Sequence, residues 1–182
     1  MRTIPLLMLI ALSVYAADPQ SQRDQAFRDL VTADLRRPFP KDAELSKRLA
    51  EHRRDFEQLV SMARADKELV RIAPDFTWTT SSVAWPRPDS QLGFAPARWD
   101  EYRRLFRGLG LEAGVLRPPD HRDAVYLLVQ TKGLVTGGST KGYAYSDTAL
   151  EPRCESLDAP LRDEGTCFKP LDDRWYIFLQ QD

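Results

Sequence analysis

The spacing of apolar residues predicts two helices in the first half of the chain. Apolar residues recur every three or four positions from residue 43 to residue 64, and Asp42 stands where a capping side chain is favoured. A second helix is expected to begin near Pro96 and to end at Gly108 or Gly110, because Pro suits a first helical turn and Gly suits a helix end. The expected buried sides are Leu45, Leu49, Phe56, Leu59, Val60 and Ala63 in the first helix, and Trp99, Tyr102, Leu105, Phe106 and Leu109 in the second.

After Gly110 the pattern changes to short β-branched and aromatic runs separated by turn residues, which is typical of strands. Asp172 and Asp173 have the length of a two-residue hairpin loop between the last two of these runs. Helices followed by strands are typical of the α+β class, so we expect N-terminal helices packed on a mainly antiparallel sheet formed by the second half. The expected strands cover residues 114–117, 124–131, 142–146, 166–171 and 174–180.

The length of 182 residues fits a single domain, which we place at residues 42–182. Residues 17–41 are polar, carry charges of both signs and include Pro38 and Pro40. We therefore expect a polar arm or a short helix there, in which Phe27, Leu30 and Val31 have helical spacing.

Residues 1–16 have the pattern of a secretory signal peptide. Arg2 precedes an apolar run, and Val14 and Ala16 flank Tyr15 as at a cleavage site. The apolar run is shorter than the roughly 20 residues that a membrane-spanning helix needs, so we expect cleavage and not a membrane anchor. The mature protein is therefore expected to be periplasmic or secreted and to have no membrane span.

Cys154 and Cys167, the two cysteines of the chain, are expected to form a disulfide in an oxidising compartment. Closing a loop of this size contributes about 3 kcal/mol in the chain-entropy model. The alternative is a redox pair or a thiol nucleophile, which would need a nearby base.

Charge and motif content exclude several classes of function. The 26 Lys and Arg residues nearly balance the 27 Asp and Glu residues, so the chain has no general attraction to nucleic acid. His52 and His121 are the two histidines, and we expect His52 packed or at the rim of its helix and His121 in a polar turn. G-x-S-x-G, S-x-x-K and H-E-x-x-H motifs do not occur. We predict no catalytic residue, no metal and no cofactor.

Two runs are candidate binding segments. Residues 73–95 form a long stretch without helical spacing and with at most a short strand near residues 76–79, and such stretches often serve as binding loops. Its candidate contacts are Trp78, Trp85 and Arg87, and the alternative is that the rings pack under the loop as part of the core. The glycine-rich run 136–142 is expected to be a hairpin loop, in which Ser139 and Lys141 could contact an anion or a partner.

Charged side chains on the helices are interpreted as solvated faces. Glu44 stands four residues before Arg48, which supports a helix. Arg103, Arg104 and Arg107 lie toward the end of the second helix, where basic side chains match the helix dipole. We therefore assign these three arginines to the helix and not to a ligand.

Four segments resemble those of uncharacterised exported bacterial proteins: RIAPDFTW (71–78), WDEYRRLFRGLGLEAGV (99–115), GLVTGGSTKGYAY (133–145) and LDDRWYIF (171–178). The resemblance implies a bacterial periplasmic setting and a single domain. It implies no activity, no ligand and no catalytic residue.

Export, a stapled α+β scaffold and an aromatic loop favour an extracytoplasmic, non-enzymatic binding module. Such a module could be a periplasmic inhibitor or an immunity-type protein that masks another envelope or secreted protein. The alternative is an envelope-directed hydrolase. A flat aromatic surface would favour the first function, and a cleft that groups two carboxylates would favour the second.

Overall fold

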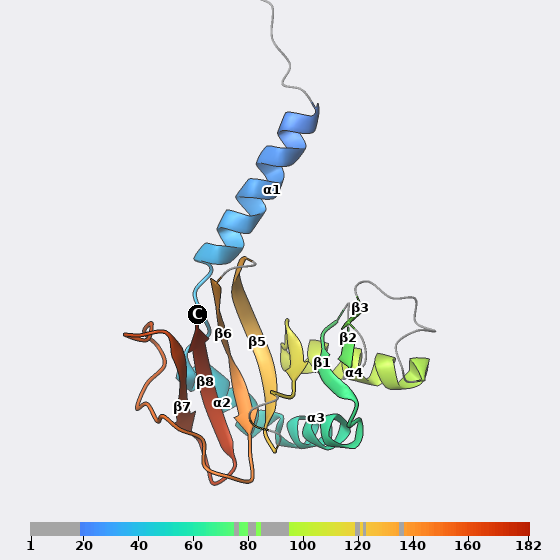
Figure 1. Ribbon diagram of the computed structural model, residues 1–182, viewed down its shortest axis with the longest axis vertical. Coiled ribbons are helices and arrows are strands. Elements are labelled where there is room, and N and C mark those ends of the chain that lie inside the picture. The colour runs from blue at the N-terminus through green and yellow to red at the C-terminus, as the bar shows by residue number, and fades with distance from the viewer. Residues whose placement is uncertain are drawn as a thin grey trace, which may run out of the picture. The chain divides into compact units, whose positions relative to one another are not determined.

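The computed structural model describes residues 19–74, 77–79, 83–84, 95–118, 121, 123–134 and 137–182 (Figure 1). The chain divides into two units, residues 1–37 and residues 38–182. Helix α1 (Pro19–Arg36) forms in the first unit, where the sequence predicted a polar arm or a short helix. Within the described residues, no helix is long and apolar enough to cross a membrane. The predicted signal peptide lies outside the described residues.

Helices α2 (Asp42–Glu51) and α3 (Arg53–Ala65) replace the single helix predicted over residues 43–64. The chain leaves helical geometry at His52, whose φ of -118° and ψ of 25° separate the two helices. His52 is exposed, so of the two expected positions, packed or at the rim of the helix, the packed one is wrong. The six apolar residues predicted on either side of the break are all buried, because the break allows both apolar sides to pack on the same sheet.

Helix α4 (Pro96–Leu109) confirms the second predicted helix. Pro96 lies in its first turn, and Gly110 ends it with a φ of 65°, a conformation that favours glycine. The five apolar residues predicted on its inner side are buried.

The described strands form one antiparallel sheet in the order β3-β2-β1-β4-β5-β6-β8-β7. The sequence predicted the strands after Gly110 but missed the short strands β1 and β3. The strands are β1 (Leu69–Ile72), β2 (Thr77–Thr79), β3 (Val83–Ala84), β4 (Gly114–Leu116), β5 (Val125–Leu134), β6 (Gly137–Tyr145), β7 (Gly165–Pro170) and β8 (Trp175–Gln181).

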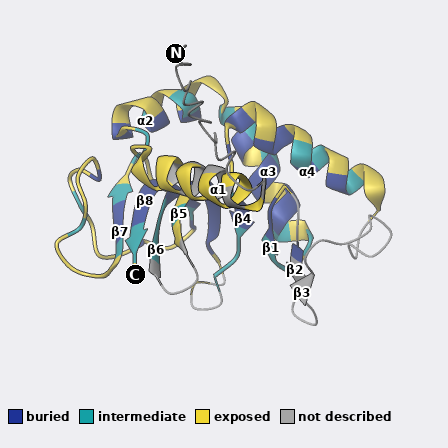
Figure 2. Ribbon diagram, turned by 90° about the horizontal axis from the view of Figure 1, so that it is seen from above, coloured by how far each residue is buried: buried dark blue, intermediate teal, exposed yellow. Residues whose placement is uncertain are grey.

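Helices α2, α3 and α4 lie on one face of the sheet (Figure 2), which confirms the α+β class. In the core between the layers, the Phe56 ring meets the rings of Tyr143 and Trp175 at centroid distances of 4.7 and 5.8 Å. The other face of the sheet carries a second buried cluster, which includes Tyr126, Leu150, Phe168, Tyr176 and Phe178. Burial on both faces explains why residues 125–129 of β5 and 175–179 of β8 are continuously apolar.

Cys154 and Cys167 form the predicted disulfide, with their Cα atoms 6.0 Å apart. Residues 154–167, called here the disulfide loop, are irregular up to the start of β7. Arg153 forms an isolated parallel bridge with Phe168, so the loop begins against the outer edge of β7.

The hairpin expected at Asp172 and Asp173 is confirmed, but its loop has four residues, 171–174, instead of the two expected. The Asp172 carboxylate accepts hydrogen bonds from the backbone N–H groups of Arg174 and Trp175, both at 2.9 Å. This bonding stabilises the turn and explains why an aspartate is favoured there.

The glycine-rich run 136–142 is not a hairpin loop. Residues 137–142 belong to β6, which pairs with β5 on one side and, from Ser139 onward, with β8 on the other. A Cβ atom on Gly142 would lie 2.1 Å from the Leu127 carbonyl oxygen. The small residue therefore allows two strands to approach closely, and does not expose backbone N–H groups to an anion.

Candidate functional site

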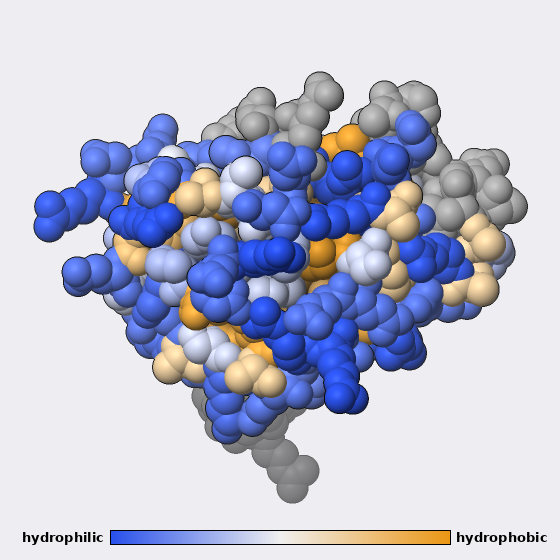
Figure 3. Space-filling view, turned by 90° about the horizontal axis from the view of Figure 1, so that it is seen from below, coloured by the Kyte–Doolittle hydropathy of each residue, from blue (hydrophilic) through white to orange (hydrophobic). Residues whose placement is uncertain are grey.

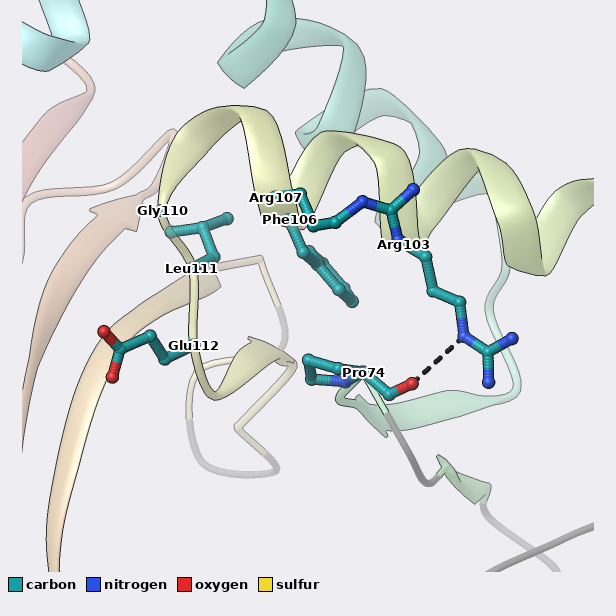
Figure 4. A pocket seen from close by; sticks show the side chains of 7 residues that line it. All are labelled: Pro74, Arg103, Phe106, Arg107, Gly110, Leu111 and Glu112. Atoms are coloured by element: carbon teal, nitrogen blue, oxygen red, sulfur yellow. Dashed lines mark hydrogen bonds between the residues drawn. The ribbon is translucent and has the colours of Figure 1, made fainter.

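A pocket of about 400 Å³ opens between α4, Pro74 in the segment after β1 and the residues that precede β4 (Figure 4). Its volume falls within the range of small-ligand sites. We call it the α4 pocket, and its described lining consists of Pro74, Arg103, Phe106, Arg107, Gly110, Leu111 and Glu112.

The floor of the α4 pocket is apolar. Phe106 and Leu111 are almost fully buried. Leu111 reaches the floor because Gly110 reverses the chain at the end of α4, and the Leu111 N–H donates to the Phe106 carbonyl oxygen at 2.9 Å. The residues that end the helix therefore also build the floor.

Arg103 is fixed at the rim of the α4 pocket. Its Nε donates to the Pro74 carbonyl oxygen at 3.0 Å, and its guanidinium lies over the Trp99 ring, 4.6 Å from the centroid. A carbonyl and an aromatic face orient a cation without cancelling its charge. The position of Arg103 is thus set, and neither of these two partners neutralises its charge.

Arg107 lies one turn further along α4 and is exposed. Within the part of the chain that the structure describes, no carboxylate forms an ion pair with Arg103 or Arg107. Like charges four residues apart destabilise a helix by a few tenths of a kcal/mol, about 0.2–0.5. The helix dipole favours Arg107 in the last turn, but it does not account for two guanidinium groups that have no carboxylate partner among the described residues beside one apolar floor.

Glu112 lines the end of the α4 pocket away from Arg103 (Figure 4). Its backbone N–H donates to the Val129 carbonyl oxygen at 3.1 Å, which ties this residue to β5. The α4 pocket is therefore cationic at one end, apolar along its floor and acidic at the other end. This polarity can orient a bound group.

A second pocket, of about 550 Å³, lies where β6 ends and β8 begins, an end of the molecule that is largely hydrophilic (Figure 3). We call it the charged pocket. Its described lining consists of Arg53, Glu57, Tyr145, Asp172, Asp173 and Arg174.

The guanidinium groups of the charged pocket have partners within the protein. Arg53 contacts Glu57 at 2.8 Å and Asp172 at 2.6 Å. Arg174 donates to the Tyr145 hydroxyl at 3.0 Å. Burial raises the pKa of Asp172, but hydrogen bonds from the Arg174 backbone and the Arg53 guanidinium outweigh burial and hold this pKa below its usual range. The charges of this pocket thus serve the fold.

Lys141, predicted as a contact for an external anion, is fully buried on β6. Its ammonium lies 2.8 Å from Asp42 Oδ1 and donates to the Leu157 carbonyl oxygen at 2.8 Å and to Asp158 Oδ1 at 3.4 Å. The prediction of an exposed Lys141 is wrong, because sequence did not reveal its buried carboxylate partner. We call Asp42, Lys141, Asp158 and Lys169 the ionic cluster.

Asp42 was expected to cap the first helix, but Lys41 holds the cap position and Asp42 is the first residue of α2. The Asp42 carboxylate accepts hydrogen bonds from the Leu157 N–H at 2.9 Å and the Lys169 ammonium at 3.0 Å. Burial raises its pKa, but these donors and Lys141 together lower it to about 2. Asp42 therefore joins distant segments instead of capping its own helix.

The remaining predicted contacts have different fates. Ser139 is half-buried on β6, and its hydroxyl accepts a hydrogen bond from Gln181 Nε2 at 3.5 Å. Trp78 lies on β2, but its side chain is outside the described part of the structure, as are Trp85 and Arg87. A binding role for Trp78, Trp85 and Arg87 stays a prediction.

Among the described residues, no group of three or more His, Cys, Asp or Glu side chains could hold a metal ion. His121, like His52, is exposed, as expected of a polar turn. Comparisons with protein-family models, with curated proteins and with solved structures found no match. The function is therefore inferred from the geometry.

Sequence analysis missed the α4 pocket, although part of its signal was visible. Arg103 and Arg107 stand four residues apart and flank Phe106 on the same side of a helix. Pro74 and Leu111 could not be added from sequence, because they meet only through the pairing of β1 with β4.

Proposed function

We propose that this protein is an exported, non-enzymatic binding module that holds a segment of another envelope or secreted protein in the α4 pocket. The observation that carries the proposal is the pair of guanidinium groups, unpaired by carboxylates among the described residues, beside an apolar floor. Masking of the bound protein, as by an inhibitor or an immunity-type protein, is the action that such a module would perform.

The chemistry of the α4 pocket selects a segment with an acidic and an apolar side chain close together. A carboxylate placed between Arg103 and Arg107 gains charge-assisted hydrogen bonds, each contributing about 1.5–3 kcal/mol. A neighbouring apolar side chain of the segment leaves water when it packs into the pocket, and adds about 25 cal/mol for each Å² of apolar surface that is buried. Glu112 disfavours a second acidic side chain at the other end, so the segment is held in one direction.

Three observations support export. Residues 1–16 have the pattern of a signal peptide. The Cys154–Cys167 disulfide is of a kind that persists in oxidising compartments. Four segments resemble exported bacterial proteins, and these observations together favour a periplasmic or secreted location.

The proposal is tested by nuclear magnetic resonance with the peptide acetyl-Phe-Asp-Leu-amide as the probe. We expect saturable shifts of the backbone amide resonances of Gly110, Leu111 and Glu112. Acetyl-Phe-Asn-Leu-amide is expected to bind about tenfold more weakly, since it lacks the carboxylate. Arg104→Ala is the control variant, because Arg104 is exposed on α4 but does not line the pocket. Its affinity for acetyl-Phe-Asp-Leu-amide should equal that of the unchanged protein. Absent shifts, or equal binding of the two peptides, would contradict the proposal.

A further inference from the structure

The disulfide loop supplies the partners of two buried charges that belong to other parts of the fold. The Leu157 N–H donates to the Asp42 carboxylate, and the Leu157 carbonyl oxygen accepts from the Lys141 ammonium. Asp158 Oδ1 accepts from the Asp42 backbone N–H at 2.8 Å and from Lys141 at 3.4 Å. Three residues in a row, counting Ser156 with its hydroxyl 3.4 Å from Asp42 Oδ2, thus contact the ionic cluster.

These contacts join three elements at one place. Asp42 begins α2, Lys141 lies on β6 and Lys169 lies on β7. Asp42 is 3% exposed and Lys141 is 0% exposed, so water does not reach either group in the folded protein. Water therefore cannot replace a hydrogen-bond partner that either group loses. A buried charge that loses its partners is strongly destabilising, so the position of Leu157 and Asp158 decides whether the cluster is stable.

The disulfide holds Leu157 and Asp158 in this position. Cys154 precedes them by a few residues, and Cys167 is buried on β7. The same loop carries exposed charged residues and exposed Pro160. Leu157 is 2% exposed and belongs to the core between helices and sheet, and the partly buried Leu161 packs against that core and donates its N–H to Gln181 Oε1.

We propose that the disulfide loop is a redox-dependent clamp, which holds α2 against β6 and β7 through the ionic cluster only while Cys154 and Cys167 are bonded. With the thiols reduced, the loop opens, water reaches Asp42 and Lys141, and the contacts between the first turn of α2 and the sheet loosen. The core formed by α3, α4 and β5 stays folded. If the chain is exported, which rests on the proposed function, it acquires its final stability only after it reaches an oxidising compartment.

Hydrogen exchange of the native protein with and without a thiol reductant tests the clamp. The Leu157 and Asp42 amides report on it, because both donate across the contact between the loop and α2. The Leu127 amide, in the middle of β5, is the control. We expect reduction to accelerate exchange of the two reporter amides about tenfold or more, and of the Leu127 amide less than about threefold.

Trypsin gives a second measurement that needs no variant. Arg162 is exposed within the disulfide loop, and we expect cleavage after it to become rapid on reduction.

Lys141→Met with the disulfide intact is the matched variant for hydrogen exchange, and we expect it to accelerate exchange of the Asp42 amide while the disulfide stays bonded. Unchanged exchange of Leu157 on reduction would overturn the proposal. Equal acceleration of all three amides would overturn it as well, because the whole domain would then unfold together.

Discussion

The two surface pockets that contain arginines differ in how their guanidinium groups are occupied. In the charged pocket, Arg53 contacts two carboxylates and Arg174 contacts a tyrosine hydroxyl, so these cations are used by the fold. In the α4 pocket, the described residues offer Arg103 a carbonyl and an aromatic ring but no carboxylate. Among the described residues, pairing with a carboxylate therefore distinguishes Arg53 from Arg103.

The comparison also concerns what lies beneath the arginines. The charged pocket is lined by charged residues and Tyr145, and no aliphatic side chain is among its described lining. The α4 pocket presents Phe106 and Leu111 beside its cations. A cation next to an apolar floor recognises a mixed acidic and apolar group, whereas a paired cation in a polar lining recognises little.

Replacing Trp99 by Ala is expected to have the largest effect, because Trp99 is 1% exposed and also orients Arg103. We expect a loss of about 3–5 kcal/mol in the free energy of unfolding, measured by urea denaturation. Trp85→Ala, in the segment outside the described residues, is expected to cost at least about 1 kcal/mol less. Equal losses would mean that Trp85 is ordinary core, and residues 73–95 would lose their interest as a binding segment.

Replacing Asp42 by Asn shows how much a fully buried ion pair contributes. The pKa of Asp42 is about 2 in the folded protein against 3.8 for the free side chain, so folding favours its ionised form. The resulting stability, about 2 kcal/mol, is present above pH 4 and is lost as the pH falls through 2. Asp42→Asn is expected to lower the free energy of unfolding at neutral pH and to remove most of its fall between pH 4 and pH 2, as measured by denaturation at each pH. If the variant loses stability over this pH range as the unchanged protein does, Asp42 is not the group with the lowered pKa.

Replacing Arg107 by Ala tests the α4 pocket, whose arginines have no carboxylate partner among the described residues. We expect the affinity for acetyl-Phe-Asp-Leu-amide to fall about tenfold, since a charge-assisted contact is lost. The free energy of unfolding should change by less than about 0.5 kcal/mol, because no carboxylate of the described protein loses a partner. A stability loss without an affinity loss would place Arg107 with the structural arginines.

Replacing Arg53 by Met tests the paired side and is expected to have the smallest effect. Its contacts with Glu57 and Asp172 are partly exposed, and exposed ion pairs contribute about 0.2–1 kcal/mol each. We expect a stability loss of this order in urea denaturation, smaller at high salt, and no change in peptide affinity. Weakened peptide binding by Arg53→Met would show that the charged pocket takes part in recognition.

Local signals made most of the fold predictable from sequence. Helix α4 was predicted from start to end, because Pro96 and Gly110 act through the conformations they allow at their own positions. The strands after Gly110 were predictable from their β-branched and aromatic composition. The break at His52 was not, because the apolar spacing on its two sides fits one continuous helix.

The sites depended on contacts between distant residues, and these could not be predicted. Lys141 was predicted to lie in a loop, but β6 places it against Asp42. The sequence around either residue contains no signal that predicts this ion pair. The arginines of α4 fitted the helix dipole, and only the meeting of Pro74 with Leu111 gave them a floor. Charge pairing is a property of the folded chain, so sequence alone could not separate the two pockets.

The central claim is that the α4 pocket, and not the charged pocket, is the contact surface for a partner. It is tested most directly by placing the photo-crosslinking residue p-benzoylphenylalanine at Glu112 or at Glu57, each of which lines one pocket and is exposed. After irradiation of cells that export the protein, we predict one discrete adduct from position 112, with the cross-link on a partner segment that carries acidic and apolar side chains. Arg107→Ala should weaken this adduct, and position 57 should give none. An adduct from position 57 alone, or equal adducts from both positions, would contradict the claim.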